Sequence, residues 1–415
     1  MKNLSIQLFL SLLCISAYSQ TKSVLFIGNS YTGVNNLPVM TKDLALSLQD
    51  TLIIDSNTPG GTTFNSHTSN STSLAKIAQG NWDYVILQAQ SQEPSFPPSQ
   101  VASQTYPYAA ILVDSILSAN ECTIPLFYMT WGRQNGDANN CASYPVICTY
   151  DGMQSRLRES YLEMAIDNDA EVSPVGAAWK YVRDNHPAIN LYSADESHPS
   201  VAGSYLAACV HYASIYKKSP VGATYISSLT SGDAANLQNA AKLIVLDSLE
   251  NWNFGIRNVQ SEFNYSPSTG AEIDFMNTSS NSTDYLWDFG DGSNSIFEHP
   301  THDYIIPGTY DVTLIATSAC NSDTVTQSIV VSIDGIQTSE TIEYIIRINP
   351  QTISITSTKF NENNVQLVSM EGKMIYQNNL FGTNLTIPKP KDSGIYLIKI
   401  SNKLSSSYSK KLFIH

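Results

Sequence analysis

The first part of the chain alternates short apolar runs with longer amphipathic stretches. Residues 24–28, 84–87 and 124–129 are almost entirely apolar, as is typical of parallel strands that are buried on both faces. Residues 153–166 and 201–216 have helical periodicity. This alternation predicts an α/β domain with a parallel sheet between two layers of helices. A further strand is expected at 52–54, and further helices are expected at 37–48, near 74–77 and at 109–117.

The pattern changes near Asn253, where helical periodicity stops and short alternating strands separated by turn residues begin. Such spacing predicts small β-sandwiches. The expected strands are 273–275, 285–287, 310–314 and 328–331, then, after a polar interval at 334–343, 353–355, 365–368, 394–400 and 410–415. We therefore predict an α/β domain at 20–255 and two β domains at 262–333 and 344–415.

The N-terminus has the pattern of a secretory signal peptide. Lys2 precedes an apolar stretch at 8–15, and Ala17 and Ser19 form a small-x-small cleavage site. The apolar stretch is too short for a membrane span, and a buried first strand or helix is the less favoured interpretation. We expect residues 1–19 to be removed and the protein to be secreted or held at the cell surface, with no transmembrane segment.

The composition agrees with export and argues against one class of binding partner. Charged residues make up 14% of the chain, and the formal net charge is −14, which argues against a nucleic-acid partner. Without Cys14 of the signal peptide the chain has an odd number of cysteines, so at least one thiol is free or intermolecular. A disulfide is expected between Cys141 and Cys148, whereas Cys122 and Cys209 are expected to be ordinary buried residues. No Cys-x-x-Cys pair is present, and neither a metal site nor a cofactor is predicted.

Three polar residues at predicted strand ends have the chemistry of a catalytic triad. Ser30 follows Gly28 and Asn29 at the end of the first strand, and Asp195 and His198 precede the helix at 201–216. The carboxyl ends of parallel strands converge on one crevice. There Asp195 would orient the imidazole, and His198 would take the proton of Ser30. Taken singly, Ser30 would be a turn serine and His198 a helix-capping residue.

Acyl transfer also needs hydrogen-bond donors for the developing oxyanion. The backbone N–H groups of Ser30 and Gly61 are candidates, and glycine allows a close approach of the chain. Gln90 is the first candidate for a side-chain donor and Gln88 the second, although both glutamines also fit the role of polar residues that cap strand ends. Tyr31, Trp131 and His67 are pocket-lining candidates for which a core or surface role is favoured.

These blocks resemble the SGNH hydrolase (GDSL-like esterase/lipase) superfamily over about the first 250 residues. The matching blocks are 27–32 (Ile-Gly-Asn-Ser-Tyr-Thr) and 195–198 (Asp-Glu-Ser-His). The resemblance implies a flavodoxin-like three-layer α/β/α fold, with Ser30 as nucleophile, His198 as base, Asp195 as its orienting acid and Gly61 as an oxyanion donor. In two places the sequence departs from the family pattern: Asn29 stands in place of aspartate, and Gln-Ala-Gln at 88–90 stands in place of Gly-x-Asn-Asp.

The two C-terminal blocks resemble other families. Residues 262–333, with Trp-Asp-Phe-Gly-Asp-Gly at 287–292, are similar to a PKD domain. Trp287 is its expected core residue, and Asp288 and Asp291 are better explained by turns than by calcium binding. The last 70 or so residues resemble the C-terminal sorting domain of the Bacteroidetes type IX secretion system. The matches are Asn349, Pro350, 370–373, 393–399 and 410–413.

The sequence therefore predicts a secreted serine esterase without a metal or cofactor. It has two expected partners: an ester substrate, which is expected to be an acylated glycan, and the type IX secretion machinery. Deacetylation of carbohydrate rests on analogy with exported glycan-degrading systems. Two alternatives stay open, namely a catalytically inactive surface protein for glycan binding or adhesion, and a lipase or thioesterase.

Overall fold

The structure is a computed structural model that describes residues 19–267, 271–331, 344–349, 351–369, 373–402 and 407–414. The predicted signal peptide lies outside the described residues except for Ser19. One compact unit contains the described residues up to Asn168 together with Val172–Asp247, and a second contains Asp169–Glu171 and the described part of Ser248–His415. None of the helices described is long and apolar enough to cross a membrane. The predicted domain boundaries stay predictions.

A five-stranded sheet with the order β2-β1-β3-β4-β5 organises the first unit. β1 pairs in parallel with β2 and β3, and β3 pairs in parallel with β4. This is the flavodoxin-like order, so the predicted fold class is confirmed. The strands are β1 (Thr21–Ile27), β2 (Thr51–Asn57), β3 (Tyr84–Leu87), β4 (Ile124–Tyr128) and β5 (Glu171–Ser173).

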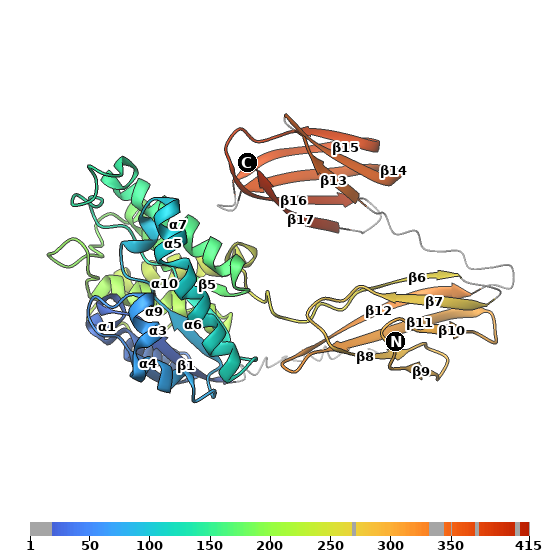
Figure 1. The fold of residues 1–415 in the computed structure, drawn as a ribbon, viewed down its shortest axis with the longest axis horizontal. Coiled ribbons are helices and arrows are strands. Elements are labelled where there is room, and N and C mark those ends of the chain that lie inside the picture. The colour runs from blue at the N-terminus through green and yellow to red at the C-terminus, as the bar shows by residue number, and fades with distance from the viewer. Residues whose placement is uncertain are drawn as a thin grey trace, which may run out of the picture. The chain divides into compact units, whose positions relative to one another are not determined.

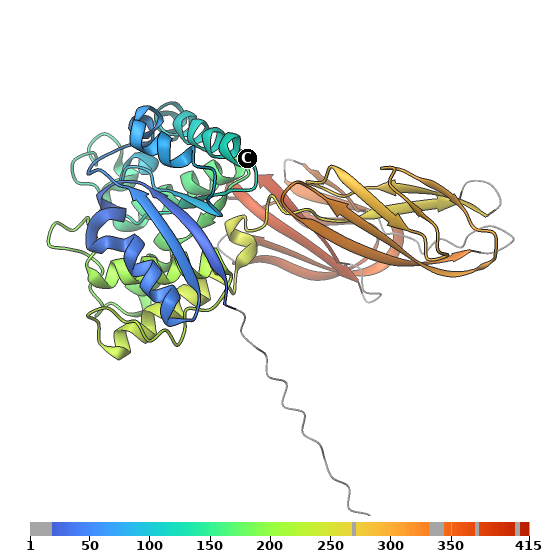
Figure 2. The same ribbon diagram turned by 90° about the horizontal axis from the view of Figure 1, so that it is seen from below.

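Helices cover both faces of the sheet. Because parallel crossovers are right-handed, a chain that moves from β1 to β2 and then back across to β3 places its helices on opposite faces. α9 packs with α2 and α10, while α6 packs with α3, α4 and α7, and Figures 1 and 2 show the sheet between these layers. The helices are α1 (Ser30–Gly33), α2 (Leu37–Ser47), α3 (Phe64–Ser69), α4 (Ser71–Ile77), α5 (Pro98–Gln104), α6 (Tyr106–Ala119), α7 (Tyr150–Asp167), α8 (Val175–Asn185), α9 (Val201–Tyr216) and α10 (Ser231–Val245).

The second unit contains the predicted β-sandwich. Its sheets have the orders β10-β7-β6 and β12-β11-β8-β9, and Trp287 is fully buried between Phe263, Phe275 and Phe289. Trp287 is therefore the core residue that the sequence predicts. The strands are β6 (Phe263–Pro267), β7 (Glu272–Asn277), β8 (Asp284–Asp288), β9 (Asn294–Ser295), β10 (Thr301–Asp303), β11 (Gly308–Thr317) and β12 (Ser322–Val331).

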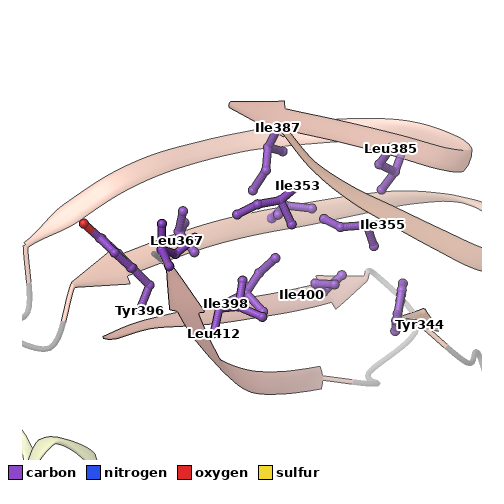
Figure 3. Packing of buried hydrophobic residues seen from close by; sticks show 12 residues of the cluster. Tyr344, Ile353, Ile355, Leu367, Leu385, Ile387, Tyr396, Ile398, Ile400 and Leu412 are labelled. Carbon is purple, nitrogen blue, oxygen red and sulfur yellow. The ribbon is translucent and has the colours of Figure 1, made fainter. Parts of the chain in front are cut away.

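The last β module packs an aliphatic core between its strands, as Figure 3 shows. Its sheet has the order β13-β14-β16-β17, and β15 pairs with β14. The predicted strands 353–355 and 365–368 belong to one long strand whose register shifts between Thr356 and Asn361; the polar residues between them hid this continuity in the sequence. The strands are β13 (Tyr344–Ile348), β14 (Thr352–Ser369), β15 (Met374–Pro388), β16 (Gly394–Asn402) and β17 (Ser407–Ile414).

Candidate active site

Ser30 lies on a tight turn where β1 ends and α1 begins. The side chain of Asn29 caps α1 by accepting a hydrogen bond from the Tyr31 N–H at 3.0 Å. The Asn29 N–H donates to Oε1 of Gln88 at 2.9 Å. A Cβ on Gly28 would lie 2.6 Å from that same oxygen, so only glycine fits beside Gln88. These contacts fix the Ser30 hydroxyl at the carboxyl edge of the sheet.

Asp195 and His198 share one turn that leads into α9. Oδ1 of Asp195 accepts hydrogen bonds from the backbone N–H groups of Ser197 at 3.1 Å and His198 at 2.9 Å. Glu196 has a φ of 60°, in the left-handed region that non-glycine residues rarely adopt. The Ser193 N–H donates to the His198 carbonyl at 2.8 Å. The turn therefore holds the carboxylate and the imidazole on the same side.

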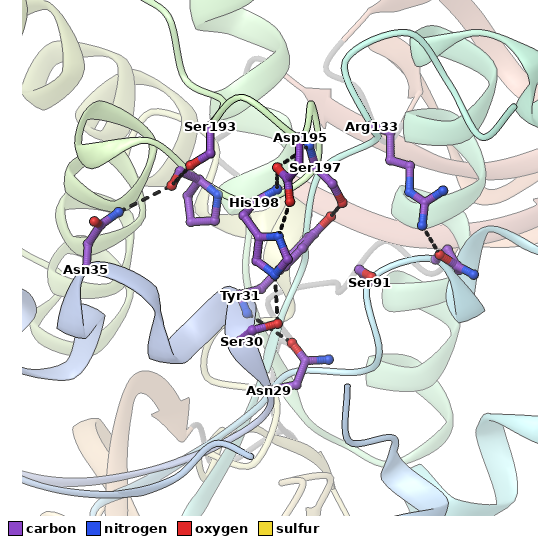
Figure 4. A network of polar contacts seen from close by, with 12 residues as sticks. Asn29, Ser30, Tyr31, Asn35, Ser91, Arg133, Ser193, Asp195, Ser197 and His198 are labelled. Carbon is purple, nitrogen blue, oxygen red and sulfur yellow. Dashed lines mark hydrogen bonds and ion pairs between the residues drawn. The ribbon is translucent and has the colours of Figure 1, made fainter. Parts of the chain in front are cut away.

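The structure brings the three predicted residues into one hydrogen-bonded chain. Nε2 of His198 lies 2.8 Å from Oγ of Ser30, and Nδ1 lies 2.5 Å from Oδ2 of Asp195. Figure 4 shows the imidazole between the other two side chains. A carboxylate only accepts, so Nδ1 carries the proton and Nε2 is left to accept from the serine. This arrangement can pass a proton from the hydroxyl to the imidazole.

Asp195 keeps its negative charge at neutral pH. Partial burial raises its pKa, but hydrogen bonds from the His198 side chain and from the backbone of His198 and Ser197 outweigh that effect, so that the pKa is lowered. The side chains of His198 and Asp195 are 34% and 49% exposed. The site is thus open to solvent, and the negative charge of Asp195 can stabilise a protonated imidazole of His198.

The backbone N–H groups of Ser30 and Gly61 are the two predicted backbone donors for the oxyanion. Within the described residues, neither the Ser30 N–H nor the Gly61 N–H has a hydrogen-bond acceptor. Gly61 has a φ of 72°, and a Cβ there would meet nothing within 4 Å. Glycine is therefore favoured at this exposed turn by the backbone conformation, and not by a lack of space for a side chain. Nδ2 of Asn29 donates to the Thr62 carbonyl at 3.2 Å and ties this turn to the turn that carries Ser30.

The two candidate glutamines have different surroundings. Gln88 is fully buried; its Oε1 accepts from Asn29 and from the Thr32 hydroxyl, and its amide donates to the Ala89 carbonyl. Gln90 is half-buried, with Nε2 3.2 Å from Oγ of Ser91 and Oε1 accepting from the Gln92 N–H at 3.1 Å. Gln88 therefore supports the turn, and the oxyanion role of Gln90 stays a prediction.

The three candidates for lining a pocket are buried side chains. Tyr31, Trp131 and His67 are at most 2% exposed, in agreement with the favoured core role. Nε2 of His67 lies 2.9 Å from the Gly28 carbonyl, and its Nδ1 lies 2.7 Å from Oγ of Ser73. His67 thus supports the turn before Ser30.

Ser197 is a site residue that the sequence analysis missed. Its Oγ lies 2.6 Å from the phenol oxygen of Tyr31, and its carbonyl accepts from Nε1 of Trp131 at 3.1 Å. A serine between Asp195 and His198 carries no signal of its own. The nearest indication of this contact in the sequence is the position of Tyr31 directly after Ser30.

The disulfide between Cys141 and Cys148 is present as predicted. Cys209 is free and buried. The prediction that Cys122 is buried is wrong: Cys122 is exposed, because it lies in a turn before β4. Among the described residues, no group of three or more His, Cys, Asp or Glu side chains is arranged to hold a metal.

Comparisons with known proteins give matches for the two C-terminal modules. Residues 261–333 match the family model of the PKD domain, and residues 349–415 match that of the secretion system C-terminal sorting domain. The modules are therefore of the predicted kinds, and the sorting domain indicates export. A search of curated proteins finds no match.

Several solved structures are similar to parts of the chain. A DUF4886 family protein from Bacteroides uniformis is 18% identical over 55% of this chain and 96% of its own, with a TM-score of 0.47. The psychrotrophic esterase EstA from Pseudoalteromonas sp. is 15% identical over 47% of this chain and 97% of its own, with a TM-score of 0.34. The PKD1 domain of the Vibrio cholerae metalloprotease PrtV is 38% identical over 17% of this chain and 93% of its own, with a TM-score of 0.16.

Proposed function

We propose that the protein is an exported serine ester hydrolase that works through an acyl-enzyme. The observation that carries this proposal is the imidazole of His198, which is bonded at once to the Ser30 hydroxyl and the Asp195 carboxylate. Such a chain lets a neutral hydroxyl act as a nucleophile, because the base takes its proton as the new bond forms. It also counts against the alternative of an inactive binding or adhesion protein.

The proposed reaction has two halves. His198 takes the proton of Ser30 while Oγ attacks the ester carbonyl, and the resulting oxyanion is stabilised by the N–H groups of Ser30 and Gly61 and the amide of Gln90. The tetrahedral intermediate expels the alcohol, which receives its proton from His198. Water, activated by the same imidazole, then hydrolyses the acyl-enzyme and regenerates Ser30.

We further propose that the substrates are small acyl esters, such as acetyl groups, on carbohydrate. Support comes from the solvent exposure of His198 and Asp195 and from the open space around Gly60 and Gly61, which suit a bulky polar alcohol. The export indicated by the sorting domain would bring the protein into contact with extracellular glycans. A lipase or thioesterase is the alternative that a series of acyl chain lengths would test.

The test compares hydrolysis of p-nitrophenyl acetate and butyrate by the full chain and by its Ser30→Ala variant. We expect the variant to lose roughly three to six powers of ten in kcat, with acetate preferred by the wild-type protein. Ser293→Ala, in the PKD domain, is the matched control and should retain full activity. Equal rates for the wild-type protein and Ser30→Ala would overturn the proposal. Acetylated glycans would then identify the alcohol.

A further inference from the structure

We infer that Tyr31 is a positioning residue whose phenol ties the segments of the site together. The inference rests on the proposed function, because it concerns the same reaction. Tyr31 directly follows Ser30, and its hydroxyl lies 2.6 Å from Oγ of Ser197, the residue before His198. One hydrogen bond thus joins the segment of the nucleophile to the turn of the base, which are far apart in the chain.

Burial keeps the phenol neutral. It raises the pKa of Tyr31, and the hydrogen bond with Ser197 opposes only part of that rise. The phenol therefore keeps its proton and can donate or accept in its bond with Ser197.

A column of stacked rings holds the phenol in place. The ring of Tyr31 lies 4.8 Å from that of Trp131 at an interplanar angle of 2°, and Trp131 lies 3.8 Å from Trp179 at 4°. All three rings are at most 2% exposed. Trp131 also donates Nε1–H to the Ser197 carbonyl at 3.1 Å. Ser197 is thus held through both its side chain and its backbone by this column.

The ring of Tyr31 also meets His198 itself. The two centroids are 5.4 Å apart at an angle of 68°, which is an edge-to-face contact that limits rotation of the imidazole. An ordinary core tyrosine would stabilise the fold without influencing the reaction. A positioning tyrosine would change the geometry between His198 and Ser30, and therefore kcat rather than substrate binding.

The kinetic test uses Tyr31→Phe, Ser197→Ala and the double variant in the full chain. Each single change should lower kcat about ten-fold, the size expected for loss of one hydrogen bond, with KM within about two-fold. The double variant should be no slower than either single one, because all three lack the same bond. Tyr216→Phe is the matched control: Tyr216 is also buried and donates to the Thr51 carbonyl at 2.6 Å, so its loss should leave kcat unchanged.

A second readout does not need turnover. The proton shared by Nδ1 of His198 and Asp195 should give a far-downfield NMR resonance that disappears in His198→Ala, and Tyr31→Phe should shift or broaden it while Tyr216→Phe leaves it unchanged. If the resonance responds but the wild-type protein hydrolyses no ester, the positioning role stands and the proposed function fails. If Tyr31→Phe matches Tyr216→Phe in kcat and in this resonance, the positioning role is wrong.

Discussion

The two units of the molecule each hold an aspartate, a histidine and a serine in hydrogen-bond contact, yet only one of these clusters can carry a proton from serine to histidine. In the α/β unit, Asp195 bonds to Nδ1 of His198 and Ser30 bonds to Nε2. The imidazole therefore lies between its partners and can accept on one side while it donates on the other.

In the PKD domain the same residue types are arranged differently. Nε2 of His302 lies 2.8 Å from Oδ2 of Asp291 and 3.2 Å from Oγ of Ser293, and the Ser293 hydroxyl donates to Asp291. Both partners share one ring nitrogen, so the histidine cannot take the serine proton while Asp291 holds it. The ring of His302 instead stacks on Phe289 at 4.2 Å. This cluster closes a turn and completes a core.

The surroundings explain the difference. Ser30 and the turn of Asp195 and His198 belong to distant parts of the chain, which the parallel sheet brings to one edge. Asp291 and Ser293 lie in the same short turn, where Oδ1 of Asp291 accepts from the Ser293 N–H at 2.9 Å. Residue type alone therefore does not define a catalytic site; the connectivity of the imidazole does.

The largest expected effect is seen when the aspartate of each cluster is replaced in turn, by Asp195→Asn and by Asp291→Asn. An amide at position 195 would no longer fix the tautomer of His198 or stabilise its charge, so kcat should fall by roughly 10³ to 10⁴. Asp291→Asn should leave kcat unchanged. Ester hydrolysis by both variants measures the contrast, and full activity of Asp195→Asn would show that His198 works without its carboxylate.

A smaller effect should separate the two glutamines. Gln90→Ala should lower kcat by roughly 10² to 10³, the usual loss for one oxyanion donor, with little change in the free energy of unfolding. Gln88→Leu removes the buried acceptor of the Asn29 N–H and the Thr32 hydroxyl, which should cost about 1–3 kcal/mol of stability for each unsatisfied group. Kinetics and urea unfolding on both variants check this, and an unchanged kcat for Gln90→Ala would exclude its oxyanion role.

The smallest effect concerns the PKD domain and pH. Partial burial raises the pKa of Asp291, but hydrogen bonds from Ser293 and His302, with the charge of His302, outweigh it and lower the pKa to about 2. Because the folded state lowers this pKa, the carboxylate stabilises the domain above about pH 4 and loses that contribution as the pH falls towards 2. The gap in thermal stability between the wild-type protein and Asp291→Asn should therefore be largest above pH 4 and close towards pH 2. A gap that is constant across this range would contradict the assignment.

The sequence predicts most of the sheet and the hydrogen-bonded chain of the site, for physical reasons. β3 and α9 have the predicted bounds because their apolar patterns are uninterrupted. β5 was missed because it spans only three residues, and α8 and α10 were missed as well. Ser30, Asp195 and His198 could be found because each lies at the end of a recognisable element.

Other features depend on side-chain directions that no local pattern encodes. Gln88 and Gln90 are alternate residues after the same strand, yet Gln88 is fully buried and holds the Ser30 turn while Gln90 is half-buried. Likewise, Ser197 gains its role from Tyr31 and Trp131, which lie far from it in the chain. Such contacts exist only once the sheet and its loops have formed.

The central claim is that Ser30 is the nucleophile and that His198 activates it. The most direct test is to treat the full chain with a fluorophosphonate and to map the modified peptide by mass spectrometry. We expect a single covalent adduct on Ser30, which forms far more slowly in His198→Ala, and none on Ser293. An adduct-free Ser30, or labelling that proceeds equally fast without the imidazole, would contradict the account.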